Sequence, residues 1–581
     1  MTSPRKSILD AEGYNVPLFL DEYRLKLDLN ENAMGPSPKV IEALRNITAQ
    51  DIKYYPAYGE VIDKLAVFNN IGTEMILPAN GADEAINYIF DAFVEQNDTV
   101  LAVTPSFAMP KLYAKILGCT YQEINYTKKF VFPIEEILEN ITEKIKLIIV
   151  TTPNNPTGEA ISRENMLKIF EYAKEKYVLI DETYVNYAEE SFLDLVEKYP
   201  NVFIMRSMSK DFGLAGLRFG YIIANEENIK HIKKVVRPYS VNIAAVKAAV
   251  AALDDIEYLN YVVSQVKESK KLLEQGLKEF AVKVYQSNSN FLLVDFGEKS
   301  EFIYKKLLNS GIKVKNFVKT PNLENCLRIS LPAVEDAKFI LDSLKARDLI
   351  IFDIDGVIID TRNSYRMAIK ETYRHFSGKE ISQEEIQKAK NLGGLNNDWD
   401  LTEYLLKNSG YNTPKNEIID RFQELYFGNN GDGFILNEEI LISPETIKNL
   451  AKKYDLAIFT GRPKQEAEFV LKRWNLEDYF SPIISMEDLP EGKHKPEPDG
   501  ILEILNIVSP RHTYYLGDTS DDIISAKRAG INAIGVLPPQ DKSTELKEKL
   551  FNEGAIEVLQ NTEDLIMLLK KMELNYANSK R

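Results

Sequence analysis

Short apolar runs that end in polar loops recur along this chain, and they constrain its fold more than any other feature. Eight such runs stand out: Thr99–Val103, Lys146–Val150, Tyr177–Ile180, Val202–Met205, Leu349–Phe352, Leu456–Phe459, Thr513–Leu516 and Ala533–Val536. Longer helical stretches separate them, which is the pattern of buried parallel strands joined by helical crossovers. The sequence therefore predicts an α/β protein whose ligands bind at the carboxyl ends of strands.

The length of 581 residues predicts several folding units, because a domain usually holds about 100–200 residues. Pro332–Arg347 has the periodicity of a helix and runs directly into the strand predicted at Asp348–Phe352. We place a domain boundary near Arg347, which gives one domain at 1–347 and another at 348–581.

The composition narrows the choice of partners. A formal net charge of −16 argues against non-specific binding to nucleic acid, and it requires local positive groups around any anionic substrate. No apolar run approaches the ~18 residues of a membrane span, and the first residues lack the apolar stretch of a secretory signal. Cys119 and Cys326 cannot build a disulfide framework, which fits a reducing compartment. We expect a cytoplasmic protein with neither a nucleic-acid nor a membrane partner.

The first group of candidate site residues surrounds Lys210, which lies in a Ser- and Gly-rich loop after the Val202–Met205 strand. Nearby hydroxyls and the Arg218 guanidinium provide a plausible phosphate cradle beside a nucleophilic amine. Gly81, at the start of a predicted helix, offers another anion site, although an ordinary helix N-cap also explains that segment. Further polar segments follow three other strands, at Thr104–Phe107, Thr151–Gly158 and Asp181–Tyr184. Together they supply the parts that a pyridoxal phosphate site requires.

On these segments, residues from about 25 to 345 resemble the fold-type-I pyridoxal-phosphate aminotransferases, and most closely histidinol-phosphate aminotransferase. The resemblance rests on Leu27–Pro38, Tyr55–Pro56, Gly81–Glu84, Asn154–Gly158, Ser207–Lys210, Asn290–Val294 and Leu327–Ser330. It implies a large mixed-sheet domain at about 40–245, with a small α/β domain built from the N-terminal segment and about 246–347. Ala33 departs from the usual proline and Phe107 from the frequent tyrosine. Tyr14 and Tyr23 are both candidates for the tyrosine that closes over substrate.

The resemblance also implies roles for individual residues. Lys210 is then the Schiff-base lysine and proton shuttle, and Asp181 pairs with the pyridine nitrogen of the cofactor. The other implied contacts are with the phenolic oxygen (Asn155, Tyr184), the ring face (Phe107), the substrate's carboxylate or phosphate (Arg328) and the cofactor phosphate (Ala82, Asp83, Ser207, Ser209, Arg218), with Ala82 and Asp83 acting mainly through backbone N–H groups. Tyr55 reaches the cofactor phosphate of a partner subunit, which implies a homodimer.

The second group of candidate site residues begins with Asp353 and Asp355, directly after an apolar strand. Residues two apart point to the same side of an extended chain, and two such carboxylates repel unless a cation lies between them. Mg²⁺ is the natural cation for such ligands. A single Asp-x-Asp segment is also common, however, in solvated turns at strand ends. Thr460, Lys495 and the segment Asp518–Asp522 add a hydroxyl, an ammonium group and more carboxylates at later strand ends. This set suits phosphoryl transfer through an aspartyl phosphate.

Residues 348 to about 575 resemble the haloacid-dehalogenase superfamily of phosphatases. By this resemblance Asp353 is the nucleophile and a Mg²⁺ ligand, while Asp355 acts as general acid and then base and offers Mg²⁺ its backbone carbonyl. Thr460 hydrogen-bonds the transferred phosphoryl group, and Lys495 neutralises charge between the nucleophile and that group. Asp518 ligates Mg²⁺ and Asp522 supports the metal site. A helical cap spans about 362–440, with helices expected at Tyr365–Phe376, Gln383–Asn391, Trp399–Lys407 and Glu417–Phe427.

Two interpretations of the cap remain open. The segment Gly393–Asp400 is either a loop with a helix N-cap or a leaving-group recognition loop at Asn396–Trp399. In the second case Arg366, Arg374 or Asn397 faces the phosphate ester. His375 and His494 lack companions at metal-ligand spacing, and we expect structural roles for them.

The two resemblances together suggest consecutive steps on one chain. Our hypothesis is that the first domain transfers an amino group from glutamate to imidazole-acetol phosphate, and that the second hydrolyses the resulting histidinol phosphate. An alternative is amination or decarboxylation of another small phosphorylated metabolite, as in threonine-phosphate decarboxylase, with a phosphatase of different specificity. A third interpretation makes one domain a non-enzymatic scaffold or sensor.

Overall fold

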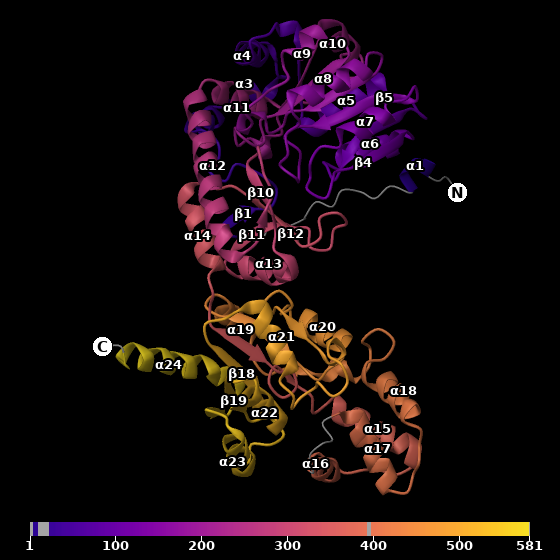
Figure 1. The fold of residues 1–581 in the computed structure, drawn as a ribbon, viewed down its shortest axis with the longest axis vertical. Coiled ribbons are helices and arrows are strands. Elements are labelled where there is room, and N and C mark those ends of the chain that lie inside the picture. Colours follow the sequence, from indigo (N-terminus) through magenta and orange to yellow (C-terminus); the bar gives the residue numbers. More distant parts are fainter. Residues whose placement is uncertain (1–3, 10–21, 392–396, 580–581) are drawn as a thin grey trace. The chain divides into compact units, whose positions relative to one another are not determined.

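The computed structural model describes residues 4–9, 22–391 and 397–579 (Figure 1). Within that part the chain divides into two compact units. One comprises the residues up to Ser300 together with Gly311–Leu344, and the other comprises Glu301–Ser310 together with the residues from Lys345 onward. Among the described residues no helix is long and apolar enough to cross a membrane.

A seven-stranded mixed sheet forms the centre of the first unit. Its strands, in spatial order, are β2 (Ile76–Ala79), β8 (Gly220–Ala224), β7 (Val202–Ser207), β6 (Tyr177–Asp181), β5 (Ile145–Thr151), β3 (Thr99–Thr104) and β4 (Thr120–Asn125). The strands from β7 to β4 pair in parallel, whereas β8 is antiparallel to both of its neighbours. The four strands predicted in this region are therefore confirmed. The antiparallel strand β8 was not among them.

Both faces of this sheet are buried, because successive side chains of a strand point to opposite sides. In β6, Val178 and Ile180 belong to one apolar core, while Leu179 belongs to another. That arrangement explains the continuous apolar runs in the sequence. The helices of this region are α2 (Pro38–Arg45), α3 (Ala49–Lys53), α4 (Gly59–Asn69), α5 (Ala82–Phe93), α6 (Met109–Leu117), α7 (Ile134–Asn140), α8 (Arg163–Tyr172), α9 (Leu195–Lys198), α10 (Glu226–Ile232) and α11 (Ile243–Leu253).

A smaller sheet of five described strands completes the first unit. Its order is β1 (Leu25–Leu27), β11 (Ile312–Asn316), β12 (Cys326–Ser330), β10 (Phe291–Asp295) and β9 (Lys283–Val284). The long helix α12 (Ile256–Leu277) and α14 (Val334–Leu344) run side by side next to it (Figure 1). The N-terminal strand β1 therefore joins residues nearly 300 positions later, as the resemblance implies.

The second unit is built on a parallel sheet of six described strands. Their order is β17 (Ile483–Ile484), β16 (Asp455–Phe459), β13 (Leu349–Phe352), β18 (Thr513–Gly517), β19 (Asn532–Val536) and β20 (Glu557–Leu559). Its helices outside the cap are α13 (Ser300–Asn309), α19 (Pro444–Ala451), α20 (Lys464–Arg473), α21 (Asp499–Val508), α22 (Ser520–Arg528), α23 (Thr544–Glu553) and α24 (Leu565–Ser579). The predicted α/β class is confirmed here as well.

The cap helices lie between the two short strands β14 (Ile359–Asp360) and β15 (Glu439–Ile440), which pair with each other. They are α15 (Tyr365–Ser377), α16 (Gln383–Asn391), α17 (Asp398–Asn408) and α18 (Lys415–Tyr426), and the four predicted helices match them within two residues at each end. α15, α17 and α18 pack on one another, to one side of the parallel sheet (Figure 1).

Candidate active sites

The first candidate site lies at the carboxyl ends of three neighbouring strands. Thr151 of β5 is paired with Asp181 of β6, and Asp181 is paired with Met205 of β7. The loops that carry Asn155, Asp181 and Lys210 therefore start from one edge of the sheet. This is the edge at which α/β proteins bind ligands.

The Lys210 amine is held by a carbonyl from a distant part of the chain. Its Nζ donates to the Leu29 carbonyl over 2.8 Å. Burial lowers the pKa of Lys210 to about 8, and the charges of Arg328 and Arg218 act in the same direction. A lysine with a lowered pKa is a better nucleophile near neutral pH than a surface lysine.

Two of the other expected cofactor contacts, Asp181 and Tyr184, are buried side chains. Asp181 is buried and accepts hydrogen bonds from the Thr183 backbone and hydroxyl at one oxygen, Oδ1, so that Oδ2 is left for another donor. Burial raises the pKa of Asp181 to about 6, and a cationic partner would reverse that shift. The Tyr184 hydroxyl accepts from the Asn30 amide over 2.9 Å. The side chain of Phe107 is half-buried beside the core that covers one face of the large sheet.

The expected substrate residue Arg328 reaches into the same place. Its guanidinium donates to the side-chain oxygen Oδ1 of Asn155 and, over 2.6 Å, to the backbone carbonyl of Asp28. Arg328 also contributes to the lowered pKa of Lys210. A positive charge therefore lies close to both the amine and Asn155, where an anionic substrate group requires it.

The expected phosphate cup combines two loops and the start of α5. Arg218 pairs with the Asp83 carboxylate over 2.7 Å, and the Ser209 N–H donates to the Ser207 hydroxyl over 3.2 Å. The Ser209 hydroxyl is buried and makes no hydrogen bond within the described structure. Gly81 has a φ of +85°, and a Cβ added there would lie 2.5 Å from the Arg218 guanidinium, so a side chain here would strain the backbone and displace Arg218. With Ala82 as the first residue of α5, the residues of this region fit a phosphate group.

These residues fit pyridoxal phosphate in both charge and position. When bound there, the cofactor supplies an electron sink for the bonds at the substrate's α-carbon. The chain would supply the amine of Lys210, the carboxylate of Asp181 and the phosphate cup. Tyr55, by contrast, is 78% exposed and stacks on Tyr239, outside this group.

The lowered pKa of Lys210 predicts how cofactor attachment depends on pH. Only the neutral amine is nucleophilic, so the rate at which cofactor-free protein gains the visible absorbance of attached cofactor should rise up to about pH 8 and level off above it. Stopped-flow absorbance between pH 6 and 10 measures this rate. A rate that still climbs at pH 10 would mean that the amine behaves like an exposed lysine.

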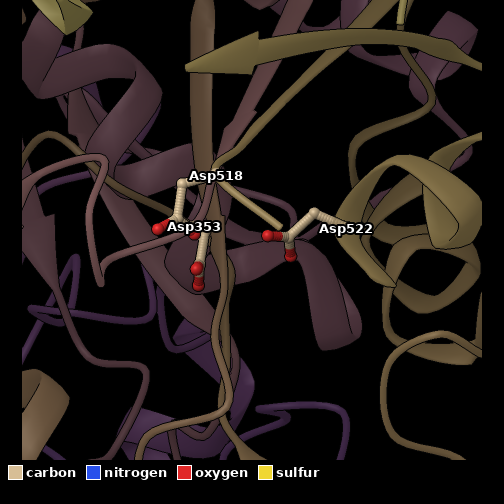
Figure 2. Close-up of side chains that lie close together, drawn as sticks. All are labelled: Asp353, Asp518 and Asp522. Carbon is tan, nitrogen blue, oxygen red and sulfur yellow. The ribbon is translucent and has the colours of Figure 1, made fainter. Parts of the chain in front are cut away.

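The second candidate site gathers three carboxylates. Asp353 follows β13, Asp518 follows β18 and Asp522 lies in the first turn of α22, and one oxygen of each lies within 4.8 Å of the others. Figure 2 shows the three side chains turned toward one another. Parallel pairing of β13 with β18 places Asp353 and Asp518 at one edge.

Lys495 is the cation that this group contains. Its Nζ lies 2.9 Å from Asp353 Oδ1 and 2.8 Å from Asp522 Oδ1. Asp522 also accepts from the Tyr515 hydroxyl and from Thr519, so both of its oxygens are engaged. Thr460 is buried at the end of β16 and accepts from the Arg462 N–H through its hydroxyl.

Three carboxylates facing one ammonium leave the site short of positive charge. Burial raises the pKa of Asp353 to about 7, and burial together with the charges of Asp522 and Asp353 raises the pKa of Asp518 well above its usual range. A divalent cation removes that penalty, and Mg²⁺ prefers carboxylate oxygens. The site therefore fits Mg²⁺, with Asp353 and Asp518 as direct ligands and Asp522 turned mainly toward Lys495.

The structure places Asp355 differently from these three residues. Its carboxylate is not part of the acidic group and instead accepts from Arg462 Nε over 2.6 Å at Oδ1. Arg462 was not among the predicted site residues. In the sequence, only its position two residues after Thr460 pointed to a role for Arg462, and that position gave no indication that Arg462 contacts Asp355.

Gly356 provides a sharp test of the metal site. Its φ is +72°, and a Cβ at this position would lie 2.1 Å from an Asp518 oxygen. We expect Gly356→Ala to displace the Asp518 carboxylate and to raise the Mg²⁺ concentration for half-maximal phosphatase activity about tenfold or more. Titration of activity with Mg²⁺ measures the change.

Gly530→Ala is the matched control for backbone strain. Gly530 has a φ of +75° with no neighbour within 4 Å, so alanine costs about 1 kcal/mol of stability and meets no side chain. Its Mg²⁺ requirement should stay at the wild-type value. If both variants show the same increase in Mg²⁺ requirement over the wild type, backbone strain and not the contact with Asp518 causes the increase.

At Asn397 the structure favours the helix N-cap over the leaving-group recognition loop. Asn397 is the N-cap of α17, and its side chain accepts from the Trp399 N–H over 2.8 Å. Arg374 is exposed and pairs with Glu371 and Glu380, whereas Arg366 donates to two glutamines of α16. His494 contacts the Met486 carbonyl, and His375 packs against Phe376. Asn396 and Tyr14 lie outside the described residues.

Comparison with known families agrees with both sites. Residues 24–339 match the family described as aminotransferase class I and II, and residues 350–536 match the family described as haloacid dehalogenase-like hydrolase. The chain therefore belongs to the class I and II aminotransferases and carries a haloacid dehalogenase-like hydrolase domain after its aminotransferase domain. Both domains are enzymatic.

Within that class, the chain is similar to histidinol-phosphate aminotransferases. It is 32% identical to the enzyme of Caldanaerobacter subterraneus subsp. tengcongensis over 347 residues, which cover 58% of this chain and 96% of that protein. The enzyme of Clostridium novyi is 31% identical over 353 residues, with coverages of 59% and 96%.

Solved structures of the same class share the fold. Histidinol-phosphate aminotransferase of Sinorhizobium meliloti, in complex with pyridoxal-5′-phosphate, has a TM-score of 0.52 at 23% identity, covering 59% of this chain and 96% of that one. The enzyme of Clostridium acetobutylicum has a TM-score of 0.51 at 24% identity, with coverages of 55% and 97%. At these identities the likeness shows the fold alone.

Proposed function

We propose that this chain catalyses two consecutive steps, transamination of imidazole-acetol phosphate by glutamate and hydrolysis of the histidinol phosphate so formed. One observation carries the first step: the chain spans 96% of the length of histidinol-phosphate aminotransferases at 32% identity. The grouping of Lys210, Asn155 and Arg328 supports it, since it sets an amine beside a cation suited to an anionic substrate. The domain boundary near Arg347 and a cytoplasmic location are parts of the same proposal.

In the proposed transamination Lys210 moves a proton at the substrate's α-carbon. Asp181 holds the pyridine nitrogen of the cofactor, Asn155 and Tyr184 hold its phenolic oxygen, and Phe107 covers the ring. Arg328 binds the anionic group of the substrate. The half-buried amine suits this role because, with a pKa near 8, it can release and regain a proton near neutral pH.

In the proposed hydrolysis Asp353 attacks the phosphorus atom. A bond forms between the Asp353 carboxylate and phosphorus while the bond to the leaving oxygen breaks, and a proton passes from Asp355 to that oxygen. Water then attacks phosphorus, gives its proton to Asp355 and releases inorganic phosphate and the free Asp353. Thr460 and Lys495 hold the phosphoryl oxygens throughout.

A coupled assay tests the pathway. Purified full-length protein is given imidazole-acetol phosphate, glutamate, pyridoxal phosphate and Mg²⁺, and histidinol and inorganic phosphate are measured. Histidinol phosphate should accumulate in the Asp353→Asn variant, and nothing should form in Lys210→Ala. If neither product appears while each domain acts on other substrates, the substrate assignment is wrong. Release of carbon dioxide from phosphothreonine would favour the decarboxylase alternative.

We also propose a homodimer in which Tyr55 completes the partner's cofactor site. Tyr55 lies among exposed apolar side chains that include Ile52 and Tyr54, with exposures of 70% and 59%. Contiguous exposed apolar groups of this kind mark interaction surfaces. In a two-fold dimer each site would then contain Lys210 of one subunit and the tyrosine of the other.

Hybrid dimers test this arrangement. At limiting cofactor, Lys210→Ala and Tyr55→Ala should each be poorly active alone. Co-refolding equal amounts should recover about a quarter of the wild-type activity, because half of the dimers then contain one intact site. Activity equal to the mean of the two separate variants would show that Tyr55 does not act across subunits.

A further inference from the structure

A buried charged cluster lies at the base of the cap in the second unit. Arg462 is 1% exposed, and its guanidinium contacts two carboxylates at once. Nε donates to Asp355 Oδ1 over 2.6 Å, while the two terminal nitrogens each lie 3.1 Å from an oxygen of Glu438. One buried cation therefore links Asp355, beside the acidic group, to Glu438.

Glu438 belongs to the end of the cap that returns to the sheet, directly before β15. It is 1% exposed, and Tyr426 of α18 and Ser364 both donate to its Oε1, over 3.0 and 2.8 Å. The Tyr426 hydroxyl also accepts from Arg462 over 3.1 Å. Groups from both ends of the cap therefore hold Glu438, and Glu438 holds Arg462.

The geometry of an arginine makes this linkage directional. A guanidinium is planar, always charged and rigid, so fixing its terminal nitrogens on Glu438 also fixes where Nε points. Both contacts with Asp355 fall on Oδ1. With Oδ1 engaged by the arginine, Oδ2 is the oxygen that we expect to exchange a proton with a bound ester. The Asp355 side chain is 35% exposed, and within the described residues its side-chain hydrogen bond is with Arg462.

We propose that Arg462 is a positioning residue for Asp355 and that Glu438 holds Arg462 in that role, so that the base of the cap sets the direction of proton transfer to the leaving group. This inference rests on the proposed phosphatase chemistry, in which the Asp355 proton passes to the leaving oxygen as its bond to phosphorus breaks. It assigns a role to two residues that lie outside the acidic group.

Leaving-group dependence is the readout. p-Nitrophenyl phosphate and phenyl phosphate have leaving groups of similar size, but only the more basic phenolate needs a proton as it departs. We measure kcat/KM for both esters with the full chain and divide the value for p-nitrophenyl phosphate by the value for phenyl phosphate. The ratio should rise about tenfold in Glu438→Gln and Arg462→Lys, since a misdirected acid penalises phenyl phosphate more.

Two further variants separate positioning from stability. Glu466→Gln alters another buried carboxylate at the base of the cap, one that contacts Tyr365 and Gln423, and its ratio should match the wild type. Asp355→Asn should raise the ratio, and adding Glu438→Gln to it should raise the ratio no further. Thermal unfolding of each variant shows whether it is folded. If Arg462→Lys does not fold, Glu438→Gln still provides the test, because glutamine has the same shape as glutamate.

The outcomes distinguish the two proposals. A uniform loss of rate on both esters, with an unchanged ratio in Glu438→Gln and Arg462→Lys, would overturn the positioning role and leave only a structural one. If Asp353→Asn hydrolyses the esters at the wild-type rate, the proposed phosphatase chemistry itself is refuted, whatever the ratio.

Discussion

The Asp353→Asn variant of the full chain should release phosphate at least about 10⁴-fold more slowly than the wild type, because the nucleophile is lost. Its aminotransferase activity should be unchanged, since no aminotransferase residue is altered. In the absence of Mg²⁺, the variant should also be at least as stable as the wild type. Asp353 carries a pKa raised to about 7 by burial, with the charges of Asp522 and Asp355 adding to it, so its charge is held at a cost. Phosphate release, amino-group transfer and thermal unfolding measure the three quantities.

Asp499→Asn is the control for a loss of charge elsewhere in the same unit. Asp499 forms a partly exposed ion pair with Lys493 over 2.9 Å, which contributes little to stability. Phosphate release should stay at the wild-type rate. Retention of most phosphatase activity in Asp353→Asn would move the nucleophile elsewhere.

The Lys210→Ala variant should lose aminotransferase activity by a factor on the order of 10⁵, since both covalent attachment and proton transfer depend on this amine. The visible absorbance of attached cofactor should disappear with it. Phosphatase activity should persist at the wild-type rate. Absorbance of the reconstituted protein and the two activities measure these effects.

Lys230→Ala is the matched control, because this lysine is exposed and pairs with Glu226 within one helix. It should keep both the absorbance and the activity. Undiminished absorbance in Lys210→Ala would place the attachment site at another lysine.

Most of the fold followed from the sequence because its strands are buried on both faces. Runs such as Lys146–Val150 and Leu456–Phe459 are continuous and short, which sets them apart from amphipathic helices. The edge strands were harder to predict. β4 at Thr120–Asn125 is largely polar, and β9 at Lys283–Val284 has two residues, so neither has a distinctive pattern.

The candidate sites followed from sequence to the extent that strand ends define them. Asp353 and Asp518 directly follow strands that pair in parallel, so topology alone brings them together. No such rule places the Asp355 side chain. Its position depends on Arg462, 107 residues away, and on a cap whose packing no local pattern records.

The amino-acid sequence by itself determined the α/β class, the order of the strands that carry chemistry, and the residue types at their ends, because burial and backbone geometry act over a few residues at a time. Only the tertiary structure decided which charged and polar groups meet. The pairing of Arg328 with Asn155, of Arg218 with Asp83, and of Arg462 with both Asp355 and Glu438 joins positions far apart in the chain. Where packing excludes water, as around Arg462 and Glu438, buried polar groups must satisfy one another.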